Sequence, residues 1–278
     1  MVHALVGAAR LLDRAEDELG KALRVELRES TGLSPAMIEW GLTTTLRSVD
    51  PLVLEGLRDE LLPKPSVRSV PARSCAVILA GNVFSASVRA LFVPLLAGVP
   101  VIAKASSRDD VLPRYLKRAL DLEDPGVGSG LEVVSFAHDE PGAREALAAL
   151  IDHAEVISVY GSDETVRELA QMQPLGARLL PHGHGISAVY VSAESLSTPE
   201  RALDAARHVA LDVAAYDQRG CLSPQFVFVE HGAVEPQAFA KLLSGEALSL
   251  FDELLPRGPL ELHEESACMQ WRAVAAVQ

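Results

Sequence analysis

From Cys75 onwards, short apolar runs alternate with helical patterns, and this alternation limits the fold more than any other feature of the sequence. Strands alternating with helices predict an α/β fold, with a mostly parallel sheet covered on both faces. Ligands of such sheets bind at the carboxyl ends of the strands. The strands are expected at 75–80, 99–103, 131–136, 156–160 and 178–180, and the helices at 85–97, 109–120, 142–151 and 163–172.

The residues on either side of this region predict two further parts. Before it, leucines and alanines recur at helical spacing from Leu11 to Leu23, Ser34 and Pro35 are typical of a helix start, and another helix is expected at 51–62. After it we expect a strand at 187–191, a helix from Ser197-Thr-Pro-Glu200 to about Ala215, and a strand at 226–229. We therefore predict a helical segment (1–70), an α/β domain (71–186) and a third part (187–278).

Composition excludes several classes of function. A net charge of −13 over 278 residues argues against nonspecific nucleic-acid binding, which needs a basic surface. No apolar run approaches the ~20 residues that span a bilayer. The cysteines, Cys75, Cys221 and Cys268, have neither metal nor redox spacing, so we predict no metal site and a reduced, cytoplasmic protein.

Cys221 is the cysteine with polar surroundings, in the run Tyr216-Asp-Gln-Arg-Gly-Cys-Leu-Ser-Pro-Gln225. A cysteine reacts as its thiolate, which needs exposure and nearby donors or positive charge such as Arg219. The usual fate of a free cysteine is a small buried apolar residue. Cys75, inside a strand, and Cys268, on an amphipathic helix, fit that alternative better.

Polar residues follow the predicted strands, each with a plainer alternative. Asn82 is placed to donate an N–H of its side-chain amide to a developing oxyanion, or to cap a helix. Lys104 is placed to bind a ribose or phosphate, or to be a solvated lysine. Gly161 and Ser162 are placed to receive a pyrophosphate, although helix capping explains Ser162 equally well. His182 and His184 lie in a glycine-rich run and suit acid–base work or a solvated loop.

Together these segments resemble the aldehyde dehydrogenase superfamily and, more closely, the LuxC-type acyl-CoA reductase family. The most specific run is Asp217-Gln-Arg-Gly-Cys-Leu-Ser-Pro-Gln225. The resemblance extends from about Leu33 to Val229. Its other marks are Leu33-Ser-Pro-Ala-Met-Ile-Glu-Trp-Gly-Leu42, Ala80-Gly-Asn-Val-Phe84, Val99-Pro-Val-Ile-Ala-Lys-Ala-Ser106 and Ile157-Ser-Val-Tyr-Gly-Ser162.

The resemblance implies a Rossmann-type open sheet in a nucleotide-binding domain (71–186), a partial catalytic domain that carries the cysteine (187–278), and an activity. Cys221 would attack an acyl thioester, carried by CoA or a carrier protein, and hold the acyl group. Asn82 and the Cys221 amide would form the oxyanion hole. Hydride from a nicotinamide cofactor would then release the aldehyde, with a long-chain fatty acyl group as the expected substrate. The residues implied to bind the cofactor are Lys104, Ser106, Ser107, Arg108, Gly161 and Ser162.

Two departures from the superfamily pattern refine this expectation. The segment that usually carries the hydrolytic glutamate falls on Pro181-His-Gly-His-Gly185, which has none. Hydrolysis needs a base to activate water, whereas thioester reduction does not, so reduction is favoured; His182 or His184 is a weaker substitute base. Ser107 stands where NAD-preferring relatives often carry an acid, and Arg108 follows it. Without the acid nothing repels the 2′-phosphate of NADPH, and Arg108 is placed to attract it, so NADPH is favoured.

About fifty residues follow Val229, fewer than an aldehyde dehydrogenase has there. The sequence therefore leaves open a non-catalytic or truncated relative that binds a nucleotide or a partner subunit. An oxidising aldehyde dehydrogenase is a third reading, disfavoured by the missing glutamate. A homo-oligomer or an association with a partner subunit is expected.

Overall fold

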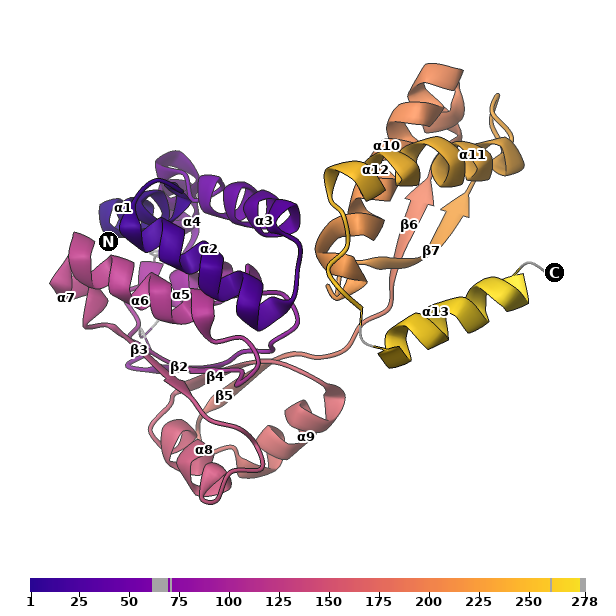
Figure 1. The fold of residues 1–278 in the computed structure, drawn as a ribbon. Coiled ribbons are helices and arrows are strands. Elements are labelled where there is room, and N and C mark those ends of the chain that lie inside the picture. Colours follow the sequence, from indigo (N-terminus) through magenta and orange to yellow (C-terminus); the bar gives the residue numbers. More distant parts are fainter. Residues whose placement is uncertain (62–69, 71, 261, 276–278) are drawn as a thin grey trace.

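The computed structural model describes residues 1–61, 70, 72–260 and 262–275. At its centre lies a five-stranded, fully parallel sheet in the order β3-β2-β1-β4-β5 (Figure 1). The chain starts in the middle of this sheet and moves to one edge before it crosses to the other. The strands are β1 (Cys75–Ile78), β2 (Val101–Ala105), β3 (Leu131–Ser135), β4 (Val156–Tyr160) and β5 (Arg178–His182).

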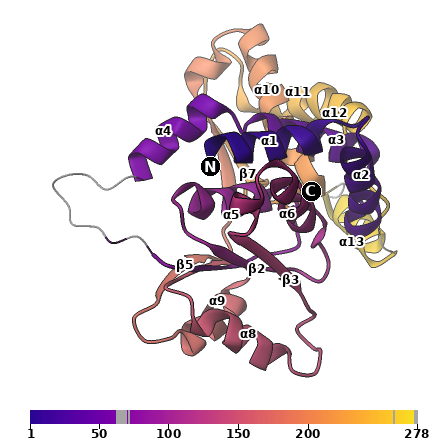
Figure 2. The same ribbon diagram turned by 90° about the vertical axis from the view of Figure 1, so that its left-hand side faces the viewer.

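Helices cover both faces of the sheet, as the alternating pattern predicts (Figure 2). One face packs on α8 (Ala143–Asp152) and α9 (Asp163–Met172), whose buried leucines and isoleucines form a small core with β1 and β4. The opposite face packs on α5, α6 and the N-terminal helices in a larger core. The helices between β1 and β3 are α5 (Ala86–Leu96), α6 (Val111–Glu123) and α7 (Pro125–Gly128).

The N-terminal helices share their core with α5 and α6. Leu5, Leu12, Leu23 and Leu42 are fully buried in it. Ser34 begins α3 as predicted, because its hydroxyl accepts the Met37 N–H. The four helices are α1 (Val2–Asp13), α2 (Glu18–Thr31), α3 (Pro35–Arg47) and α4 (Pro51–Leu61).

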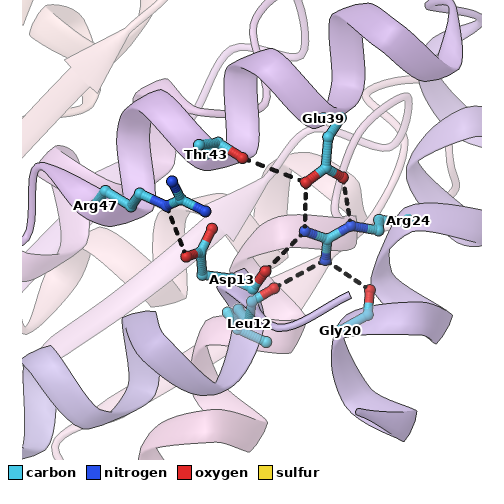
Figure 3. Close-up of polar contacts among 7 residues, drawn as sticks. All are labelled: Leu12, Asp13, Gly20, Arg24, Glu39, Thr43 and Arg47. Atoms are coloured by element: carbon cyan, nitrogen blue, oxygen red, sulfur yellow. Dashed lines mark hydrogen bonds and ion pairs between the residues drawn. The ribbon is translucent and has the colours of Figure 1, made fainter. Parts of the chain in front are cut away.

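The region of helical spacing from Leu11 to Leu23 forms two helices, α1 and α2, and Arg24 stabilises the turn between them (Figure 3). Its guanidinium donates to the carbonyls of Leu12 and Asp13 at the end of α1, at 3.0 and 2.9 Å, and also to the Gly20 carbonyl. Glu39 of α3 neutralises it, with Nε 2.6 Å from Oε2. The turn between α1 and α2 is therefore stabilised from within, and the leucine spacing alone did not reveal it.

The remaining elements form a smaller unit around two parallel strands, β6 (Ser187–Val191) and β7 (Pro224–Val229). Their inner valines pack on α10 and the helices that follow in a third core. Thr198 begins α10 as its N-cap by accepting the Arg201 N–H. The surrounding elements are η1 (Ala193–Leu196), α10 (Pro199–Ala214), η2 (Ala215–Gln218), α11 (Pro236–Leu242), η3 (Leu243–Ala247), α12 (Leu248–Leu254) and α13 (Leu262–Ala275).

Three sequence-based details are wrong. Lys104 does not follow the second strand but lies within β2, which begins two residues later than predicted. Pro181 and His182 belong to β5 rather than to a loop. Cys268 is half-exposed on α13 rather than buried.

Lys64-Pro65-Ser66 and Val70-Pro71 are typical of a linker, and of these residues the structure describes only Val70. The division of the chain at 70 and 186 stays a prediction. No helix among the described residues is long and apolar enough to cross a bilayer.

Candidate active site

Cys221 is exposed in the loop between η2 and β7, whereas Cys75 is buried in β1. Burial raises the pKa of the Cys75 thiol to about 11, which keeps it protonated at neutral pH. The predicted contrast between these two cysteines is therefore present in the structure. Of the two thiols, the exposed one is suited to react.

The residues just before Cys221 have an unusual backbone. Tyr216, Asp217 and Gln218 have φ angles of 54°, 52° and 60°, in the left-handed region that costs non-glycine residues about 1–2 kcal/mol each. Such conformations persist only where the surroundings hold them, and they cluster at functional sites. The run turns the chain sharply between α10 and the cysteine.

Asn82 reaches this loop from the other part of the chain. Its Nδ2 atom donates to the Arg219 carbonyl at 2.8 Å, two residues before Cys221. A side-chain amide has two N–H donors, so one remains to stabilise an oxyanion. The helix-cap alternative does not hold for Asn82, because α5 has Ser85 as its N-cap. The Cys221 carbonyl in turn accepts from the Ser187 hydroxyl at 2.6 Å.

Gly81 explains how Asn82 reaches its place. A Cβ atom on Gly81 would lie 2.3 Å from the Ser106 Oγ atom, so the turn after β1 packs against the turn after β2 only because this side chain is missing. Gly81 thus lets the turn that carries Asn82 contact one of the predicted cofactor-binding turns, the one that carries Ser106.

A pocket of about 490 Å³ lies at the carboxyl ends of β1, β2 and β4. It is lined by four of the predicted cofactor-binding residues: Lys104, Ser106, Gly161 and Ser162. Its volume is in the range of small-molecule and cofactor sites. Ser162 is also the N-cap of α9, because its hydroxyl accepts the Thr165 N–H, so the capping alternative holds for this residue.

Lys104 is one of the cationic side chains of this pocket, whose lining also includes Arg144. Its ammonium group lies 5.0 Å from the centre of the Phe136 ring. Burial lowers the pKa of Lys104, and the nearby Glu140 carboxylate partly opposes that change. A half-buried cation has fewer competing waters, which strengthens its attraction for a ligand oxygen.

The other two predicted cofactor residues lie outside the pocket lining. Ser107 and Arg108 form the exposed tip of the turn that links Ser106 to Asp109. The Arg108 N–H donates to the Ser106 hydroxyl at 3.2 Å. Within the described part of the chain, no carboxylate forms an ion pair with Arg108.

The two histidines are placed on the β5 side of the sheet edge. His182 stacks on Tyr160, with ring centres 4.2 Å apart. The His184 backbone N–H donates to the Asp163 carboxylate at 3.1 Å. Among the residues that the structure describes, neither histidine hydrogen-bonds to the Cys221 loop, so nothing here supports either as a base for that thiol.

Residues of the N-terminal helices also contact the loop, and sequence reasoning did not assign them to the site. The Tyr216 ring lies between Trp40 and Phe84, with centroid distances of 5.5 and 5.6 Å. A Cβ on Gly41 would lie 2.9 Å from both aromatic side chains, Tyr216 and Phe84. The available signal was the family mark Leu33–Leu42, which contains Trp40 and Gly41.

Comparison with known proteins decides the family. The profile of the family described as "Acyl-CoA reductase (LuxC)" matches residues 59–278. The chain belongs to the LuxC family. It is 25% identical over 215 residues to a long-chain acyl-protein thioester reductase of Photorhabdus laumondii, covering 76% of this chain and 43% of that protein. It is 27% identical over 213 residues to the protein of that name from Aliivibrio fischeri, covering 75% and 42%.

Solved structures show the fold of this LuxC chain. An NAD-dependent benzaldehyde dehydrogenase from Corynebacterium glutamicum superimposes with a TM-score of 0.72 at 16% identity, covering 99% of this chain and 61% of the other. A glyceraldehyde-3-phosphate dehydrogenase from Methanocaldococcus jannaschii gives 0.62 at 13% identity, covering 87% and 52%. The fold is therefore that of aldehyde dehydrogenases, as the sequence motifs predict. The chain spans less than half the length of the curated relatives it matches.

Proposed function

We propose that this LuxC chain reduces a long-chain fatty acyl thioester, carried by CoA or by a protein, to the aldehyde, with NADPH as reductant and Cys221 as nucleophile. The observation that carries the proposal is the hydrogen bond from Asn82 to the Arg219 carbonyl. This bond joins an amide donor from the sheet edge to the loop that carries an exposed cysteine, which supports the proposal. That pairing of thiol and oxyanion donor is what acyl transfer requires.

The residues at the sheet edge fit a nicotinamide nucleotide. The 490 Å³ pocket combines apolar walls with the Lys104 ammonium group and the amino end of α9, where backbone N–H groups favour a phosphate. Arg108, exposed beside Ser106, would attract the 2′-phosphate of NADPH. When bound, this cofactor supplies a hydride.

The chain's own groups account for the acyl steps. The Cys221 thiolate attacks the thioester carbonyl, a new C–S bond forms, and the bond to the carrier thiol breaks. The leaving thiolate takes up a proton, while the free N–H of Asn82 stabilises the oxyanion. Addition of a hydride to the acyl carbon then breaks the bond to Cys221 and returns its electron pair to sulfur. One hydride and one proton are consumed for each aldehyde formed, and no water needs activating.

Substitution of the cysteines tests the nucleophile. Cys221→Ala should abolish both acyl transfer from labelled long-chain acyl-CoA and NADPH oxidation. Cys268→Ala, which removes the half-exposed thiol on α13, is the matched control and should retain both. If the Cys221→Ala protein still became acylated, and the label were found on a peptide from another part of the chain, the nucleophile would lie elsewhere.

A second substitution tests the oxyanion donor. Asn82→Ala should lower kcat about 10²- to 10³-fold, because one donor to the oxyanion is lost, while NADPH binding persists. Aldehyde formation at the wild-type rate would remove Asn82 from the mechanism. If NADPH raises the unfolding temperature of the wild-type protein but no thioester consumes it, the non-catalytic alternative holds instead.

A further inference from the structure

The left-handed run before Cys221 needs external support. Tyr216, Asp217 and Gln218 all have side chains, and three consecutive left-handed residues without a glycine are individually unfavourable. Only Arg219 and Gly220 separate the run from the cysteine. Relaxation of this backbone would therefore displace Cys221 relative to Asn82.

Tyr216 supplies the first anchor. Besides its ring contacts with Trp40 and Phe84, its hydroxyl hydrogen-bonds to Ser85 at 2.7 Å. Its backbone N–H points at the Met37 sulfur, 3.2 Å away. Burial raises the pKa of the Tyr216 phenol, so the hydroxyl is neutral at physiological pH. Helix α3 on one side and the turn that precedes α5 on the other therefore hold the first left-handed residue.

Arg219 supplies the second anchor. Its Nη1 atom donates to the Thr31 carbonyl at the end of α2, at 2.7 Å. Its Nη2 atom lies 3.9 Å from the Asp217 carboxylate, whose side chain is only 5% exposed. That carboxylate also accepts the Gly258 N–H at 3.2 Å. The guanidinium therefore interacts with the N-terminal helices and the left-handed run.

We propose that Tyr216 and Arg219 are positioning residues, which lock the strained loop onto the N-terminal helices and so set the Cys221 thiol against the Asn82 amide. The catalytic part of this proposal rests on the proposed function, whereas the conformational part does not. The competing view is that Arg219 acts by its charge and favours the Cys221 thiolate. The contact with Thr31 speaks for position, because a carbonyl is an orienting partner and carries no net charge.

Two variants separate position from charge. Tyr216→Phe keeps the aromatic packing and loses the bond to Ser85, and Arg219→Gln loses the charge and the reach to Thr31. Arg201→Gln on α10 is the matched control, since that arginine pairs with Glu194 away from the loop. Amide hydrogen exchange of the full chain, resolved to a peptide spanning 214–223, measures the loop without requiring any activity.

Positioning predicts faster exchange in this peptide for both loop variants and not for the control. It also predicts that kcat falls by about 10- to 100-fold while KM changes little, because a small displacement of the Cys221 thiol slows the reaction. The pH midpoint for alkylation of Cys221 by iodoacetamide should stay where it is in the wild type. A midpoint that moves to higher pH in Arg219→Gln would establish the charge role and overturn the proposal.

A second-site substitution gives an independent check. Gln218→Gly introduces the residue that adopts φ near 60° at no steric cost. Added to Tyr216→Phe, it should slow the exchange of the loop again and recover part of the kcat. Unchanged or faster exchange in the double variant would refute the anchoring of a strained run. Faster exchange in the two loop variants, combined with a wild-type chain that reduces no thioester, would refute the proposed function and leave the anchoring intact.

Discussion

Asp109 gives the pH dependence that follows most directly from the structure. Its side chain lies in the turn after β2, the residue is only 6% exposed, and its Oδ1 atom is buried with no hydrogen-bond partner among the described residues. Burial, and then the neighbouring Asp110 carboxylate, raise the pKa of Asp109 from its ordinary 3.8 to about 6. Folding therefore favours the protonated form of the Asp109 carboxyl over the charged form.

The sign of the effect follows from proton binding. Between about pH 4 and pH 6 the folded protein holds a proton on Asp109 that the unfolded chain has lost, so the free energy of unfolding falls as pH rises. The change in pKa corresponds to roughly 3 kcal/mol across this window. Above it, the folded protein carries a buried carboxylate, one oxygen of which has no hydrogen-bond partner among the described residues. Asparagine at this position cannot ionise and should remove the loss.

Urea unfolding followed by circular dichroism, repeated from pH 4 to pH 8, measures this difference. The gap in unfolding free energy between Asp109→Asn and wild type should grow in favour of the variant by about 3 kcal/mol as pH rises. Asp212→Asn, at an exposed position on α10, is the control and should follow the wild type at every pH. Parallel curves for Asp109→Asn and wild type would refute the assignment.

Three further predictions rest on burial and close packing. Iodoacetamide at pH 7.5 should modify Cys221 long before Cys75, whose pKa near 11 keeps it a thiol, and peptide mass spectrometry measures the order. Leu12→Ala should lower the unfolding free energy by about 2–5 kcal/mol, since Leu12 is fully buried, whereas Leu175→Ala, at a fully exposed leucine, should leave the urea midpoint unchanged. Gly81→Ala should lower the unfolding free energy by about 1–3 kcal/mol, because its Cβ would lie 2.3 Å from the Ser106 Oγ atom. It should also weaken NADPH binding in a thermal-shift titration. Gly56→Ala on α4 is the control: a Cβ there has nothing within 4 Å, so the substitution should stabilise the protein slightly. A wild-type melting curve for Gly81→Ala would contradict the contact.

The sequence predicts the elements of the sheet well wherever local signals mark their ends. The strand Val156–Tyr160 and the helix Asp163–Met172 have the predicted bounds, because Gly161 and the Ser162 cap separate them. The second strand is displaced for a physical reason. Pro100 has no N–H, so the ladder with β3 begins when the Val101 N–H donates to the Gly130 carbonyl. It continues beyond Lys104, which the apolar pattern alone did not indicate.

Part of the candidate site could likewise be predicted from the sequence, and part could not. The residues at the strand ends could be predicted, because parallel strands bring their carboxyl ends to one edge, and four of them line one pocket. The supports of the Cys221 loop could not, because they come from distant segments. The contact of Tyr216 with Met37 spans 179 residues, and that of Arg219 with Thr31 spans 188. No periodicity or capping signal encodes such pairs.

These distant contacts give the family marks a shared physical meaning. The run Leu33–Leu42 contributes Met37, Trp40 and Gly41 to the surface on which Tyr216 rests, and the run that ends at Gln225 contains Tyr216's neighbours and the thiol. The mark around Asn82 meets the same loop through the Arg219 carbonyl. The three segments thus contact one another: Leu33–Leu42 and Ala80–Phe84 together hold the loop that carries the Cys221 sulfur. A substitution at Met37, Trp40 or Gly41 should therefore displace the loop that carries Cys221, although these residues lie far from it in the sequence.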